Sequence, residues 1–171
     1  MIRLWGRIDL VWGEGQIPAE LSGFPGYLMV RLGHDSSRRF REALAPEDLH
    51  PRDFGVMNIV AAAPGITQQR LHTRTAIDTS SMVAVIDHLE KLGYAERRPS
   101  AEDRRIRAIH LTPAGHEALG RARRIARELQ GQVFGALTED ERTTLHDLLR
   151  KLAAANLPGQ GGPTAPGAAG G

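Results

Sequence analysis

The sequence predicts a mainly α-helical fold that contains one small β-hairpin, and two observations support this fold class. Apolar residues recur at helical spacing over most of residues 25–155, and Pro64-Gly65 and Gly93 break the pattern where helices are expected to end. Between residues 94 and 111 the pattern changes. The runs YAERR and IRAIHL are each long enough for one short strand, and they flank a polar, charged loop.

Two helices are expected in the first part of the chain, between residues 25 and 64. The first covers residues 25–44, and its inward side chains are expected to be Leu28, Leu32, Phe40 and Leu44. The second opens at His50-Pro51, because proline is well tolerated in the first turn of a helix. Its apolar residues at helical spacing are Phe54, Met57, Val60 and Ala61.

A helix-turn-helix is expected next. Thr67 can cap a short helix over the run QQRLHTRT, since its hydroxyl can accept from a free backbone N–H. After a tight turn, Asp78 can cap a longer helix that runs to Leu92, and Gly93 supplies the stop. The inward stripe of the longer helix is expected to be Met82, Val83, Ile86, Leu89 and Leu92.

The hairpin extends this motif to a winged helix, which is a helix-turn-helix followed by a β-hairpin with a basic tip. Segment 97–107 carries five arginines, and all but two of the 22 cationic residues in the chain are arginine. The planar donor fork of arginine suits phosphates and base edges. We therefore expect this wing to contact DNA, and we expect Asp103 to hold one of its arginines in an ordered pose.

Composition excludes several other classes of protein. The chain has 171 residues, of which 41% are hydrophobic, as expected for one globular domain. No apolar run approaches the roughly 18 residues of a membrane span, and the absence of cysteine fits a cytoplasmic protein. No two of the seven histidines have the i, i+4 spacing of a metal site, and there is no nucleophile elbow or phosphate loop. We therefore expect neither an enzyme nor a metal or other cofactor.

Five short motifs carry a family resemblance. They are Leu49-His50-Pro51-Arg52-Asp53-Phe54, Asp78-Thr79-Ser80-Ser81, Leu89-Glu90-Lys91-Leu92-Gly93-Tyr94, Asp103-Arg104-Arg105 and Leu111-Thr112-Pro113-Ala114-Gly115. With them the chain resembles the MarR family of bacterial transcriptional regulators, over roughly residues 25–155. The spacing from the Asp-x-Arg of the wing to the following Leu-Thr-x-x-Gly is highly specific.

The resemblance implies a homodimer whose terminal helices interlock, with one winged helix on each side. It divides the chain into an N-terminal extension (1–24), a dimerisation helix (25–48), a winged helix-turn-helix core (49–112), C-terminal dimerisation helices (113–156) and a tail (157–171). The tail is uncharged and consists largely of Gly, Pro and Ala, which predicts disorder. The chain departs from the family pattern at His50, His72, Thr75 and Ala76, and these departures affect local packing and not the fold.

Eight side chains are expected to contact DNA. They are Thr67, Gln68, Thr79, Ser80, Ser81, Arg98, Arg104 and Arg105. In an arbitrary protein the hydroxyl residues would be ordinary members of a helix start, and the arginines would belong to a solvated loop. Side by side in a winged helix, they favour contact with bases and phosphates. The arginines of the following helix, at positions 121, 123, 124 and 127, are expected to form a solvated or dimer-pairing face.

The expected function is that of a sequence-specific, double-stranded DNA-binding regulator, a repressor that a small ligand releases from a pseudo-palindromic operator. The alternative is a winged-helix module for protein interaction or architecture, without a ligand response. The resemblance implies an aromatic acid or a phenol as the ligand. Arg31 and His34 lie one turn apart on the first helix, so they can present donors to one anion. In the alternative interpretation they face solvent or pair across the dimer. The apolar wall of the pocket would be Tyr27, Phe54 and Met57.

Overall fold

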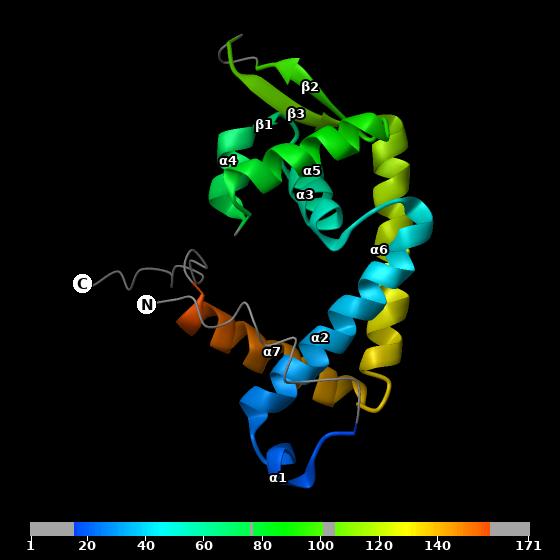
Figure 1. The fold of residues 1–171 in the computed structure, drawn as a ribbon, viewed down its shortest axis with the longest axis vertical. Coiled ribbons are helices and arrows are strands. Elements are labelled where there is room, and N and C mark those ends of the chain that lie inside the picture. Colours follow the sequence, from blue (N-terminus) through cyan, green and yellow to red (C-terminus); the bar gives the residue numbers. More distant parts are fainter. Residues whose placement is uncertain (1–15, 76, 101–104, 158–171) are drawn as a thin grey trace, which may run out of the picture. The chain divides into compact units, whose positions relative to one another are not determined.

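The computed structural model describes residues 16–75, 77–100 and 105–157, and it confirms a mainly helical chain with one small antiparallel sheet (Figure 1). The chain divides into two compact units, Met1–Pro51 and Arg52–Gly171. Among the described residues of the first unit, every regular element is a helix or a helical turn. The sheet and the predicted helix-turn-helix belong to the second unit.

The first unit is built around α2 (Pro25–Leu44), which has the bounds that the sequence predicts. It follows the single turn α1 (Ala19–Ser22) and leads into the 3-10 turn η2 (Ala45–Glu47). Pro25 stands at the first helical position, where its missing N–H costs no hydrogen bond. Contrary to the predicted inward face, Leu32 is 59% exposed in the single chain.

The second unit begins with α3 and ends with two long helices. Its elements in chain order are α3 (Pro51–Ala62), β1 (Ile66–Thr67), α4 (Gln68–Arg74), α5 (Thr79–Lys91), β2 (Ala95–Pro99), β3 (Arg107–Leu111), α6 (Pro113–Val133) and α7 (Glu139–Asn156). The predicted order of helices and hairpin is confirmed.

Side-chain caps begin the helices where the sequence predicts them. The hydroxyl of Thr67 accepts from the backbone N–H of Arg70 at 3.3 Å, and a carboxylate oxygen of Asp78 accepts from that of Ser81 at 2.9 Å. Thr112 caps α6 in the same way, through a 3.0 Å bond from the N–H of Gly115. At the other end of α5, Gly93 has a φ of 72°, a left-handed conformation that glycine adopts without strain.

The sheet contains one strand more than the sequence predicts. The expected hairpin is present, and β3 pairs with β2 so that Ala95 lies opposite Leu111 and Pro99 opposite Arg107. On its other edge β3 pairs with β1, where Ile66 lies opposite Ile109. Strand β1 is only two residues long, too short for a recognisable alternation of apolar and polar residues.

The core of the second unit lies between its helices and the inner side of the sheet (Figure 1). Its fully buried side chains include Val56, Met57, Leu71, Met82, Ile86, Leu89, Ile109 and Leu119. The predicted stripe on α5 is wrong at Val83, which is 37% exposed, whereas Val85 is buried. At about 100° per residue Val83 lies roughly 100° from Met82 and 120° from Leu89, while Val85 lies only about 60° and 40° from them.

Candidate nucleic-acid interface

Helix α5 has one buried and one exposed side. Met82, Val85, Ile86 and Leu89 anchor it in the core. Its exposed residues are Thr79, Ser80, Val83, Ala84, Asp87 and Lys91. Of the hydroxyl residues expected to contact DNA, the first two are exposed and Ser81 is half-buried. The exposed side therefore offers small polar and apolar groups to a partner, on a helix whose position the core fixes.

The start of α5 is organised around Asp78. The same carboxylate oxygen that accepts from the backbone N–H of Ser81 also accepts from the hydroxyl of Ser80 at 2.6 Å. The Ser80 hydrogen bond first, and then those from Ser81, hold the pKa of Asp78 well below its ordinary value. Asp78 is consequently ionised at neutral pH, and the hydroxyl hydrogen of Ser80 is committed to it.

An ionisable pair of one buried and one half-buried side chain joins α3 to α5. Asp53 is buried in α3 (1% exposed), and its carboxylate lies 3.2 Å from Nδ1 of His88 on α5. Sequence reasoning did not single out this contact. Asp53 is an acidic residue among the apolar residues of α3, and such a residue needs a partner when the helix is buried. The pair holds the middle of α5 at a defined place on α3.

The turn between α4 and α5 accommodates the residues that depart from the family pattern. His72 is exposed and its Nδ1 lies 2.8 Å from the carbonyl oxygen of Ile77, beyond the turn. The hydroxyl of Thr75 donates to the carbonyl of Leu71 at 3.0 Å. Both side chains thus bond backbone groups near the turn in place of apolar packing, and Ala76 lies outside the described residues. Gln68, expected to contact DNA, is the half-buried first residue of α4.

The hairpin carries the arginines of the predicted wing. Arg98 on β2 has a side chain that is 58% exposed, and it forms an ion pair with Glu96 two residues earlier. Arg105 is also exposed, just before β3. Asp103 and Arg104 lie outside the described residues, so the bracing of the wing by Asp103 stays a prediction.

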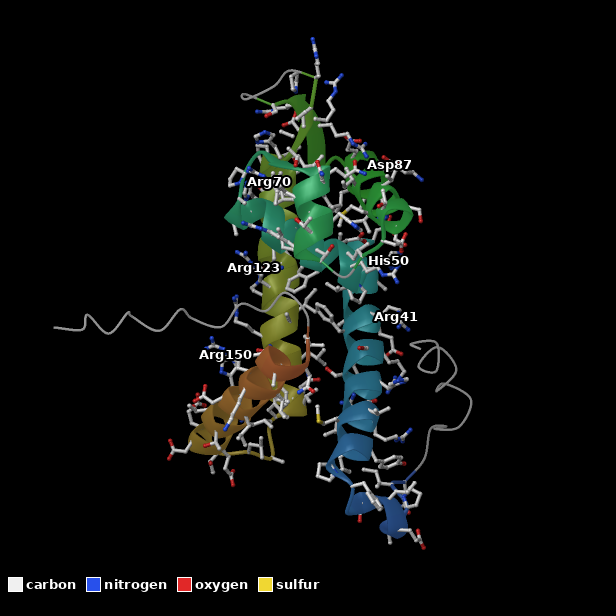
Figure 2. The ribbon with its side chains drawn as sticks, turned by 90° about the vertical axis from the view of Figure 1, so that its left-hand side faces the viewer. Arg41, His50, Arg70, Asp87, Arg123 and Arg150 are labelled. Carbon is white, nitrogen blue, oxygen red and sulfur yellow. The ribbon has the colours of Figure 1, made fainter. Side chains whose placement is uncertain are left out.

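A different arginine links the described part of the wing to α5. The backbone N–H of Arg97 on β2 donates to Glu90 at 2.9 Å, and its guanidinium pairs with the same carboxylate. The guanidinium also donates to Asp87 at 2.6 Å; Figure 2 labels Asp87 on α5. Sequence reasoning counted Arg97 only as one of five basic residues. The signal that it missed is the pair of acidic residues three apart on one side of the preceding helix.

Helix α6 packs closely against the end of α5. A Cβ atom on Gly115 would lie 1.9 Å from the carbonyl oxygen of Tyr94, so only glycine fits in this first turn. The hydroxyl of Thr112 donates to the carbonyl of Gly93 at 2.6 Å across the same junction. Further along, Nε of Arg123 donates to the side-chain oxygen of Asn58 on α3 at 2.9 Å. The Thr-x-x-Gly motif is therefore a packing motif that joins α6 to the turn between α5 and β2.

The residues of the predicted ligand pocket lie in both units. Tyr27 and Arg31 are half-buried on α2, and His34 is exposed there. Phe54 is half-buried on α3, while Met57 is fully buried. The first three residues belong to the unit that ends at Pro51 and the last two to the following unit. A single pocket formed by all five stays a prediction.

Within residues 16–75, 77–100 and 105–157, the side chains of His, Asp and Glu do not gather in any group of three or more that can hold a metal ion. None of the helices in these ranges has the length and apolar character needed to cross a membrane.

Helices α3, α4 and α5, followed by a hairpin that pairs with β1 and is fixed to α5, make a winged helix-turn-helix domain. The MarR family model matches residues 47–106, which include the helix-turn-helix and most of the wing. A Thauera aromatica chain assigned as a transcriptional regulatory protein for the hcr operon is 33% identical over 138 residues, 80% of this chain and 82% of that one. The chain belongs to the MarR family.

Solved structures of similar sequence have the same fold. The transcriptional repressor CouR, bound to a 23-mer DNA duplex, matches with a TM-score of 0.72 and 31% identity, over 81% of this chain and 99% of CouR. CouR from Rhodococcus jostii RHA1, bound to p-coumaroyl-CoA, matches with a TM-score of 0.70 and 25% identity, over 81% and 95% of the two chains. The predicted fold class and family are thereby confirmed.

Proposed function

We propose that the chain is a sequence-specific DNA-binding transcriptional regulator that acts as a repressor in the cytoplasm. The observation that carries the proposal is the exposed side of α5, which presents Thr79 and Ser80 beside an arginine-bearing hairpin that Arg97 ties to the same helix. A helix of this kind enters the major groove of B-DNA, and the wing reaches the adjacent phosphates or minor groove. The eight expected DNA contacts, including Arg104, belong to this proposal.

The regulator works as a homodimer in this proposal. In the single chain α2 exposes Met29 and Leu32, and α7 exposes Leu148, Leu149 and Leu152. Exposed apolar groups of this size on long helices favour burial against a second copy. A two-fold dimer places its two α5 helices in successive major grooves, so the operator is pseudo-palindromic with half-sites about one helical turn apart. Segments 25–48 and 113–156 form the dimer, and deletion of the tail, 157–171, should leave dimerisation and DNA binding intact.

A small ligand controls the affinity for DNA in this proposal. Arg31 and His34 supply donors for an anionic group, and Tyr27, Phe54 and Met57 supply the apolar wall, a combination that suits an aromatic acid or a phenol. CouR, which binds an aromatic acyl thioester in its structure, is a relative with a ligand of related chemistry. If the ligand binds more tightly to dimers whose two α5 helices are out of alignment with successive major grooves, it lowers the affinity for the operator.

Transcription from a reporter promoter tests the repressor. Duplexes enriched by the purified full-length chain from a random library are placed across the promoter, and scrambled duplexes serve as the control. We expect the chain to lower transcription only from the promoter with enriched duplexes. Unchanged or increased transcription would contradict repression.

Release of the same duplex by benzoate-like and phenolic acids tests the pocket. We expect Arg31→Ala protein to need more of an active compound, with its affinity for the duplex unchanged. A compound that acts equally on both proteins would rule out Arg31 as its donor.

A further inference from the structure

The exposed side of α5 lacks the side chains that usually recognise guanine. Guanine presents two acceptors, N7 and O6, in the major groove, and arginine or lysine most often binds them. From Thr79 to Glu90, α5 contains no arginine, lysine, asparagine or glutamine, and Lys91 is its last residue. The groups that α5 presents instead are hydroxyls, methyls and a carboxylate.

Ser80 faces its partner as a hydrogen-bond acceptor. Its hydroxyl donates to Asp78 over 2.6 Å, and a serine hydroxyl has only one hydrogen to give. Because Asp78 is held ionised by this bond and those from Ser81, it has no proton to return. The lone pairs of the Ser80 oxygen therefore suit an amino group, which in the major groove is N6 of adenine or N4 of cytosine.

Val83 adds an apolar group beside this acceptor. It follows Ser80 by three residues, so the two side chains are neighbours on one side of the helix. Val83 is 37% exposed, and Ala84 next to it is exposed as well. A methyl group in the major groove is found only on thymine, whose natural partner is the adenine that carries N6. Cytosine offers an amino group without a methyl group.

We propose that Ser80 and Val83 together recognise an A·T base pair in each operator half-site, with Ser80 accepting from adenine N6 and Val83 contacting the thymine methyl. This inference rests on the proposed function and specifies the DNA that the same surface selects. Asp87 lies one turn beyond Val83, and Arg97 binds one of its carboxylate oxygens, so the acceptor beside Val83 is the hydroxyl of Ser80. The polar and the apolar contact thus fall on the two bases of one pair.

Selection from random duplexes with the full-length chain tests this assignment. We expect the wild-type chain to enrich half-sites that contain an A·T pair. The Ser80→Ala chain should lose the preference for adenine at this pair, and the Val83→Ser chain should lose the preference for thymine. Ser80→Thr keeps a hydroxyl and should keep the adenine preference. Arg98→Ala is the matched control, because loss of a phosphate contact weakens binding to all duplexes alike and leaves the base preferences unchanged.

Base analogues then isolate the two contacts in the enriched duplex. Deoxyuridine in place of that thymidine removes only the methyl group, and we expect wild-type affinity to fall about fourfold, the factor that corresponds to one buried methyl group. Val83→Ser protein should be insensitive to the change. Replacing the adenine with unsubstituted purine removes N6. This change should weaken duplex binding by the wild-type chain and leave binding by Ser80→Ala protein unchanged.

Two results would overturn the assignment. One is a G·C pair at the positions that respond to Ser80→Ala or Val83→Ser, and the other is a set of base preferences that neither substitution alters. Failure of the proposed function has a different signature, since the wild-type chain would then enrich no duplex and bind none at low salt.

Discussion

Arg97 on strand β2 holds the carboxylate of Glu90 on α5 through two of its groups. Its backbone N–H donates to one oxygen at 2.9 Å, and its guanidinium pairs with the other. The side chain of Arg97 is only 24% exposed, so water weakens the ion pair less than on an open surface. Through this contact the first strand of the wing keeps a defined orientation relative to α5.

Arg97→Ala should therefore weaken DNA binding without removing a phosphate contact. We expect the free energy of unfolding to fall by about 1 kcal/mol, because the substitution removes a half-buried charged hydrogen bond between the Arg97 guanidinium and Glu90. We also expect a lower affinity for the enriched duplex, because the wing is less ordered before binding. The slope of log affinity against log salt should stay at its wild-type value, measured by fluorescence anisotropy.

Arg98→Ala is the comparison, since the Arg98 side chain is 58% exposed and is proposed to meet a phosphate. Here the salt slope should become shallower by about 1, the value for one lost phosphate contact. If Arg97→Ala reduces the salt slope as much as Arg98→Ala does, Arg97 is a phosphate contact and not a brace.

Asp78 makes stability depend on pH in the acid range. Its pKa in the folded chain lies below the ordinary value of 3.8, so its contribution is fully present above about pH 4 and declines as the pH falls toward the lowered value. Asp78→Asn keeps a capping oxygen and should remove this part of the acid dependence. Thermal unfolding of both proteins between pH 7 and 3 checks this, and parallel losses of stability would contradict the role given to Asp78.

Gly115 and Gly120 offer a matched pair of substitutions on α6. Gly115→Ala places a Cβ 1.9 Å from the backbone oxygen of Tyr94, so we expect a loss of about 3 kcal/mol or more, as for severe overpacking. A Cβ on Gly120 meets nothing within 4 Å. Gly120→Ala should leave stability unchanged or raise it by up to about 1 kcal/mol through helix propensity. Denaturant unfolding that shows equal effects would contradict the close packing at Gly115.

The exposed leucines of α7 should hold the dimer together. Leu148→Glu combined with Leu152→Glu places two charges in the apolar face, and we expect a monomer by sedimentation velocity at micromolar concentration. Arg150→Glu is the control, because Arg150, labelled on α7 in Figure 2, is about 160° around the helix from both leucines and should leave the dimer intact. A wild-type monomer, or a dimer that survives the double substitution, would contradict this interface.

Much of the fold could be predicted from local signals in the sequence. Thr67, Asp78 and Thr112 cap helices where a hydroxyl or carboxylate precedes an apolar pattern, and Gly93 ends α5 where a left-handed residue is needed. Strand β1 could not be predicted, because two residues carry no periodic pattern and depend on pairing with distant Ile109 and Ala108. Val83 was misplaced because an apolar residue was assumed to be buried.

The site was predictable as a class of residues and not as a set of contacts. The clustering of arginines indicated a wing, and the small hydroxyl residues indicated the exposed start of α5. Which arginine braces the wing depends on the position of β2 against α5, a contact between elements that spacing in the sequence does not reveal. The same holds for the Asp53–His88 pair, whose members are 35 residues apart.

Binding of the full-length chain to an enriched duplex, against a scrambled duplex of the same length and base composition, is the most direct test of sequence-specific DNA recognition. The two affinities are measured by fluorescence anisotropy over a series of salt concentrations. We predict that the enriched duplex binds about a thousandfold more tightly near physiological salt and that both affinities fall as salt is raised. Equal affinities for the two duplexes at every salt concentration, or no binding to either, would contradict the proposed function.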